Sequence, residues 1–136
     1  MKHLTSLLLG GLLLSACGAG ANDGGNPGFA FAGTLGVTSP LPAGTTTCQA
    51  TTLVTFSNMG ADIHIVSLAG GGCLEFLNTD TAPHQPASFG ATVCPELNGP
   101  SLATSARYTT PPLNGPVTCQ WQDALTPLPP GGGNGY

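Results

Sequence analysis

The sequence contains very few basic residues. Only two of its 136 residues are Lys or Arg, against six Asp or Glu, and charged residues make up 6% of the chain. If residues 1–16 are removed, as argued below, Arg107 is the only basic residue that remains. One Arg cannot form the basic patch that binds nucleic acid or the polybasic segment that binds anionic lipid. We therefore expect no nucleic-acid partner.

The sequence also lacks a long apolar run and the common catalytic motifs. Its N-terminal apolar run, residues 4–14, has eleven residues, whereas a membrane-spanning helix needs about 20. Gly-x-Ser-x-Gly, His-Glu-x-x-His and Cys-x-x-Cys patterns are all missing. One Trp and two Tyr leave little aromatic surface to line the cleft of a sugar-cleaving enzyme. We expect a protein that is not an enzyme.

An export signal is present at the N-terminus. Met1-Lys2-His3 precedes the apolar run, and small residues follow it, which is the layout of a secretory signal peptide. The string Leu14-Ser15-Ala16-Cys17 resembles a bacterial lipobox. That resemblance implies cleavage before Cys17, lipid on Cys17 and attachment to the membrane through this lipid. The alternative is an ordinary signal peptide in which Cys17 is incidental.

A lipid-anchored chain would lie in the cell envelope, facing the periplasm or the exterior. Because Gly18 and not Asp follows Cys17, resemblance to diderm lipoproteins implies the outer membrane if the cell has one.

The Gly and Pro residues gather toward the two ends of the chain, which predicts four segments. These are a signal peptide (1–16), the lipidated Cys with a flexible Gly/Pro-rich spacer (17–46), a folded domain (47–128) and a disordered tail (129–136). Within the spacer, apolar residues alternate from Phe29 through Leu35 to Val37. A first edge strand at this place is the alternative.

Five cysteines are an odd number for an exported protein. Lipid on Cys17 leaves four, which predicts two disulfides in an oxidising compartment, with three possible pairings. We prefer Cys48–Cys73 and Cys94–Cys119, each of which closes a loop of about 25 residues. In the chain-entropy model such a loop stabilises the fold by roughly 3–4 kcal/mol.

The middle of the chain reads as short strands. Val, Ile, Thr, Phe and Leu occur in short runs separated by Gly and Pro, and no stretch has a helical period. Within residues 73–78, Leu74 and Phe76 lie on one face of the predicted strand and Glu75 lies on the other. Trp121 falls on a strand that is predicted to lie inside the fold. Strands are predicted at 53–56, 63–68, 73–78, 88–93, 105–109 and 116–121. This pattern favours an all-β sandwich or barrel.

Three segments resemble parts of the cupredoxins. Residues 76–84, which run Phe-Leu-Asn-Thr-Asp-Thr-Ala-Pro-His, are similar to the strand and loop that deliver the first copper-binding histidine. Residues 94–98 resemble a Cys-Pro-Glu-Leu element of some bacterial members, and residues 115–127 resemble the closing strand and ligand loop. The resemblance covers about residues 50–127 and implies a Greek-key β-sandwich of cupredoxin type.

The same resemblance implies a set of candidate metal ligands: His84, Cys119 and Gln122. A blue copper site needs two imidazoles and a thiolate. Here Gln122 stands where one His is expected, and Ala124 stands where a second would follow. Cys119 cannot be a ligand if it is bonded to Cys94. We therefore expect a lost or degenerate copper site and no cofactor, with copper held by His84 and a reduced Cys119 as the alternative.

These observations predict a membrane-anchored envelope lipoprotein with a non-enzymatic cupredoxin-like domain. Its role would be interaction or envelope structure, with an unidentified envelope protein as a partner. One alternative is a periplasmic copper-binding or electron-transfer cupredoxin that uses His84 and Cys119. Another is a surface adhesion or assembly lipoprotein unrelated to metal.

Overall fold

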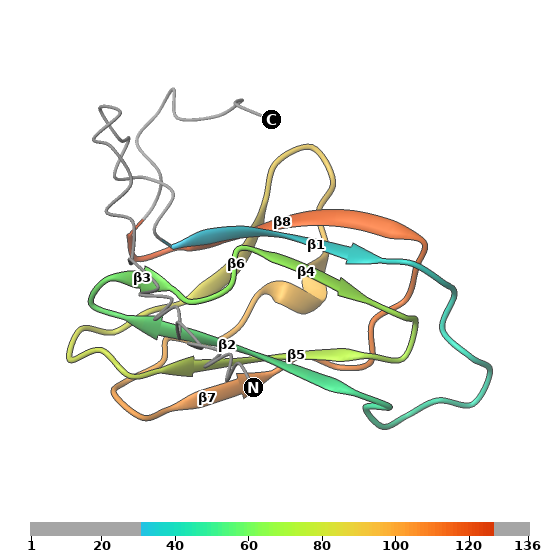
Figure 1. Ribbon diagram of the computed structural model, residues 1–136, viewed down its shortest axis with the longest axis horizontal. Coiled ribbons are helices and arrows are strands. Elements are labelled where there is room, and N and C mark those ends of the chain that lie inside the picture. The colour runs from blue at the N-terminus through green and yellow to red at the C-terminus, as the bar shows by residue number, and fades with distance from the viewer. Residues whose placement is uncertain (1–30, 127–136) are drawn as a thin grey trace, which may run out of the picture.

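A computed structural model describes residues 31–126 (Figure 1), and this part of the chain is all-β. Two four-stranded mixed sheets face each other, as in a β-sandwich, and η2 (Pro95–Leu97) is the one helix among these residues. Sheet A has the order β4 (Ile65–Leu68), β1 (Ala32–Val37), β8 (Val117–Asp123), β6 (Pro86–Phe89). Sheet B has the order β3 (Gly60–Ala61), β2 (Thr51–Ser57), β5 (Cys73–Asn78), β7 (Arg107–Thr109).

The core lies between the two sheets and is centred on three aromatic rings. Phe56 and Phe76 come from sheet B, and Trp121 comes from sheet A. The Trp121 ring centroid lies 5.9 Å from that of Phe56 and 5.4 Å from that of Phe76. All three side chains are fully buried, so the predicted inner position of Trp121 is confirmed. The predicted alternation in β5 is confirmed too, because Leu74 and Phe76 are buried while Glu75 is not.

The chain changes sheet at almost every connection. Only β2 and β3 are both consecutive in sequence and paired, and they form an antiparallel ladder. Two pairs are parallel, β1 with β4 and β2 with β5. The first and last described strands, β1 and β8, pair antiparallel, with Ala32 opposite Gln122. Most strand pairs therefore join segments that are far apart in sequence.

The strand predictions agree with the structure, with one difference near the start. Each of the six predicted ranges contains or overlaps an observed strand, and the predicted range 73–78 coincides with β5. The difference is β1, which lies within the range 17–46 assigned to a flexible spacer. It is not the edge strand considered as the alternative, because it lies between β4 and β8. Leu35 and Val37 anchor it in the core.

The structure forms the two preferred disulfides, Cys48–Cys73 and Cys94–Cys119. The parallel register of β2 and β5 explains the first, because Thr51 is opposite Cys73 and Cys48 lies just before β2. The second joins the residue before η2 to the inward face of β8. Each disulfide spans 25 residues.

The predicted signal peptide, Cys17 and the residues of the predicted tail fall outside the described residues. Within residues 31–126, no helix has the length and apolar character needed to cross a membrane.

Two glycines of β1 give a matched test of the packing. A Cβ at Gly33 would lie 2.5 Å from Cζ2 of Trp121 and 2.6 Å from the carbonyl oxygen of His64. At Gly36 the nearest atom, the carbonyl oxygen of Val66, would be 3.9 Å away. We expect Gly33→Ala to lower the free energy of unfolding by about 1–3 kcal/mol through overpacking. Gly36→Ala should change it by less than about 0.5 kcal/mol.

Urea unfolding followed by the fluorescence of Trp121, the one Trp in the chain, measures both effects. Equal effects of the two substitutions would contradict the close contact between β1 and Trp121.

Candidate functional site

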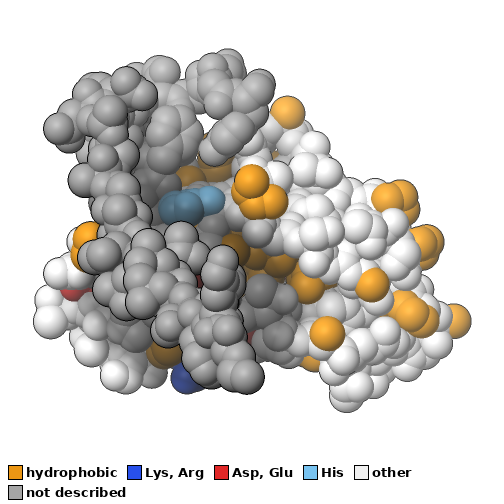
Figure 2. All heavy atoms as spheres, in the orientation of Figure 1, with side chains coloured by type: hydrophobic (Ala, Val, Ile, Leu, Met, Phe, Trp, Pro, Cys, Tyr) orange, Lys and Arg blue, Asp and Glu red, His pale blue; other side chains and the backbone are white. Residues whose placement is uncertain are grey.

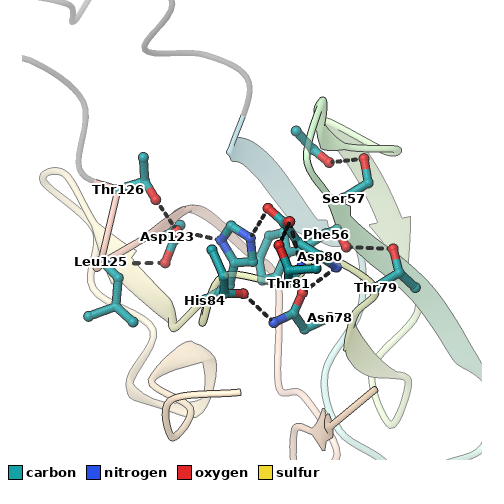
Figure 3. Close-up of polar contacts among 12 residues, drawn as sticks. Phe56, Ser57, Asn78, Thr79, Asp80, Thr81, His84, Asp123, Leu125 and Thr126 are labelled. Atoms are coloured by element: carbon teal, nitrogen blue, oxygen red, sulfur yellow. Dashed lines mark hydrogen bonds and ion pairs between the residues drawn. The ribbon is translucent and has the colours of Figure 1, made fainter. Parts of the chain in front are cut away.

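His84 lies in the interior between two carboxylates (Figure 3). Its side chain is 2% exposed; Nδ1 lies 2.8 Å from Oδ2 of Asp123, and Nε2 lies 3.2 Å from Oδ2 of Asp80. An ionised carboxylate only accepts hydrogen bonds, so each ring nitrogen must carry a proton to bond both partners. Each ring nitrogen lies within hydrogen-bond distance of one carboxylate oxygen.

Asn78, the last residue of β5, shapes the loop that carries His84. Its buried Nδ2 donates to the carbonyl oxygens of Ala82 and Leu102, both at 2.8 Å. Its Oδ1 accepts from the backbone N–H of Asp80 at 2.8 Å, which is an Asx-turn. The backbone of His84 then exchanges two hydrogen bonds with Leu102. The spacing Asn-x-Asp followed by His thus directs both Asp80 and His84 inward.

Asp123, the last residue of β8, is the more buried of the two carboxylates, with 0% exposure. It accepts from the backbone N–H groups of Gln85 (2.7 Å) and Leu125 (3.0 Å). It also accepts from Oγ1 of Thr126 at 2.6 Å, in addition to His84. Burial by itself raises the pKa of Asp123, but these hydrogen bonds together outweigh burial and hold the pKa below its ordinary value of 3.8.

Asp80 lies nearer to the surface. The hydrogen bond from His84 is the main reason that the pKa of Asp80 lies below its ordinary value of 3.8. Backbone N–H groups of the loop add to this effect, and partial burial opposes it.

Two aromatic rings cover the faces of the His84 ring. Phe31 stacks on it with centroids 4.7 Å apart and an interplanar angle of 26°. Phe56 packs against it at 5.3 Å in a tilted arrangement. Both nitrogens are thus hydrogen-bonded and the ring is enclosed by core side chains, so His84 acts as a structural link between the loop, β8 and the core.

The structure does not bring the three candidate metal ligands together. Cys119 is bonded to Cys94, and its side chain points into the core. Gln122 is three residues further along β8, so its side chain points to the opposite face of sheet A. Within residues 31–126, no group of three or more His, Cys, Asp or Glu side chains is arranged to hold a metal ion. Placed in this way, His84, Cys119 and Gln122 do not fit a blue copper site.

The carboxylates are the functional residues that sequence reasoning missed. Asp80 lies within the Asn-x-Asp motif that precedes His84, and the motif alone indicates no role for its carboxylate. Asp123 continues the alternation of Cys119 and Trp121, which both face the core. That alternation was the available signal, because an Asp at an inward position needs a buried partner.

His64 differs from the buried His84. It is exposed, and its Nδ1 lies 2.7 Å from the carbonyl oxygen of Ala32.

Comparisons of this protein with protein-family models, with curated proteins and with solved structures find no match.

The lowered pKa values of Asp80 and Asp123 make the stability depend on pH. Near pH 4 the folded protein binds fewer protons than the unfolded chain. The stabilisation that these two carboxylates give the fold is therefore complete above pH 3.8, the ordinary pKa of Asp. It is lost as the pH falls through the lowered pKa values of the folded state. We expect Asp123→Asn to lower the free energy of unfolding at neutral pH by about 3 kcal/mol, because the groups that donate hydrogen bonds to the buried carboxylate lose a charged acceptor. The variant should also lose less stability than the wild type between about pH 6 and about pH 3.

Glu96→Gln is the matched control, since Glu96 takes part in none of the ion pairs within residues 31–126 and accepts the Tyr108 hydroxyl through its backbone oxygen. It should retain the acid dependence of the wild type in urea unfolding at both pH values. If Asp123→Asn and the wild type lose stability in parallel, Asp123 does not contribute in the way described.

Proposed function

We propose that this protein is a lipid-anchored protein of the bacterial cell envelope whose β-domain is a cupredoxin-like module without a working copper site. It acts by interaction or as an envelope structure, and it catalyses no reaction. The observation that carries the proposal is the state of the two expected ligands. Both nitrogens of His84 are bonded to carboxylates, and Cys119 is bonded to Cys94.

The positions of the segments that resemble cupredoxins support this proposal. Residues 76–84 and 115–127 meet where His84 contacts Asp123. Residues 94–98 are joined to the same strand by the Cys94–Cys119 disulfide. Three stretches that are separate in sequence are therefore neighbours in space, as the parts of one ancestral metal site would be.

The hydrogen bonds supply a structural substitute for the metal. A metal ion would hold the histidine loop and the closing strand together through coordination. Here Asp123 links them directly, and the two carboxylates match the two ring nitrogens of His84. Such a domain keeps its rigidity but offers no redox centre, which favours a binding or structural role.

The cysteine count supports the lipid anchor. The two disulfides use four of the five cysteines, and the fifth is Cys17 in the lipobox-like string. An additional unpaired thiol in an exported protein would need a reason, and lipid on Cys17 provides one.

Copper titration tests the metal part of the proposal. The full-length protein, purified from membranes, should show no free thiol after denaturation and no intense visible thiolate–copper absorption with Cu(II), because both expected ligands are occupied. His84→Ala should leave any weak Cu(II) binding unchanged. An intense band, or tight binding that disappears in His84→Ala, would establish the copper-binding alternative.

Fractionation tests the anchor. In a bacterium that processes lipoproteins, Cys17→Ser should move the protein out of the membrane fraction, because no residue then accepts the lipid. Ser15→Ala keeps a small residue at its position and should remain in the membrane fraction. Mass spectrometry of the N-terminal peptide reports the lipid directly. A Cys17→Ser protein that stays in the membrane would show that another feature attaches the chain.

A further inference from the structure

The outer face of sheet A carries an open pocket of about 300 Å³. This volume lies at the lower end of the range for small-molecule sites. The pocket is separate from the buried His84 cluster, which lies on the inner side of the same sheet. Its lining residues come from β1, β8, the end of β6 and the segment that follows it: Thr34, Phe89, Ala91, Thr92, Thr118 and Gln120.

The floor of the pocket follows from the strand register. Gln120 of β8 is opposite Thr34 of β1 on one side and opposite Phe89 of β6 on the other. Side chains at paired positions share a face of the sheet. Neighbouring Trp121 and Cys119 point into the core, so Gln120 and Thr118 point outward.

The wall of the pocket is a loop that is fixed at its base. This loop, residues 90–93, follows β6 and projects beyond β8 in Figure 1, where it is drawn in gold. The backbone N–H of Cys94 donates to Oγ of Ser88 at 2.9 Å and closes the loop. The Cys94–Cys119 disulfide ties the end of the loop to β8.

Gly90 shapes the turn of this loop beside the pocket. It has a φ of +88°, and a Cβ there would lie 2.6 Å from Oε1 of Gln120. The wall is therefore held in place before any ligand arrives.

The lining is uncharged and combines polar groups with apolar ones, Phe89 and Ala91 among them. The hydroxyls of Thr34, Thr92 and Thr118 and the amide of Gln120 make no hydrogen bond within residues 31–126. Phe89 adds one half-buried aromatic ring. Figure 2 shows few charged side chains on the described part of the face that it views. The lining offers no charge to bind an ion.

We propose that this pocket binds a neutral saccharide unit. An anionic ligand would need a cation for charge-assisted hydrogen bonds, and the lining has none. An apolar ligand would bury the hydroxyls and the amide without partners, which is costly. Sugar hydroxyls both donate and accept, as Thr and Gln side chains do, and the C–H face of a pyranose can pack on the Phe89 ring. This site goes beyond the proposed function and depends neither on the anchor nor on copper.

Saturation-transfer NMR on the full-length protein, in a detergent without a sugar headgroup, tests the proposal. The probes are maltotriose, cellotriose, mannotriose and chitotriose, with trigalacturonate as the anionic comparison. We expect at least one neutral trisaccharide to bind with a dissociation constant of about 1 mM or tighter. Trigalacturonate should bind more weakly than this neutral trisaccharide.

Variants locate the site. Gln120→Ala should weaken binding about fivefold through lost hydrogen bonds, and Phe89→Ala about tenfold through lost ring contact. Gln122→Ala is the matched control. Gln122 is on the same strand and the same outer face but outside the pocket lining, so binding should change less than about twofold. Urea midpoints near that of the wild type verify that each variant is folded.

The proposal is overturned if none of the four neutral trisaccharides binds at about 10 mM. It is also overturned if folded Gln120→Ala and Phe89→Ala proteins bind as the wild type does, or if trigalacturonate binds best. None of these results would change the copper or fractionation experiments.

Discussion

The carboxylate of Asp123 joins parts of the chain that lie far apart in sequence. It accepts two backbone and two side-chain hydrogen bonds while fully buried. A buried charge is tolerated only when such partners are present, so the loop ending at Gln85 and the chain beyond β8 must both adopt these conformations. His84, held by Asp123, then fills the space between Phe31 and Phe56. The polar cluster and the aromatic core therefore depend on each other.

The strands of the middle region could be predicted because each one shows its alternation locally. Trp121 was placed in the core for the same reason. The position of β1 could not be predicted, since Gly33 and Gly36 interrupt its pattern within a Gly-rich segment. Gly33 is required by the close approach of Trp121, which is a contact with a strand far along the chain. The parallel pairs likewise join strands from distant segments, and no local pattern reports them.

The candidate site was found in part. The motif around Asn78 led to His84, and the even count of remaining cysteines led to the two disulfides. The role of His84 depends on Asp123, which lies 39 residues away, so only the folded chain shows that both ring nitrogens are bonded. No sequence pattern predicted the outer pocket, because Thr and Gln at outward positions of a strand are typical of any solvent-facing surface. Only the loop fixed by Cys94 turns them into one concave surface.

The place of β8 in sheet A has a consequence for how the domain can be made. β8 is the last described strand, yet it lies between β1 and β6 and is the only strand that pairs with both. Until residues 117–123 have been synthesised, β1 and β6 have no common neighbour and Trp121 is missing from the core. No N-terminal fragment that ends before β8 contains a complete sheet A, so the sandwich of residues 31–126 cannot be completed until β8 is present. A premature stop codon before residue 117 would therefore abolish the domain and not merely shorten it.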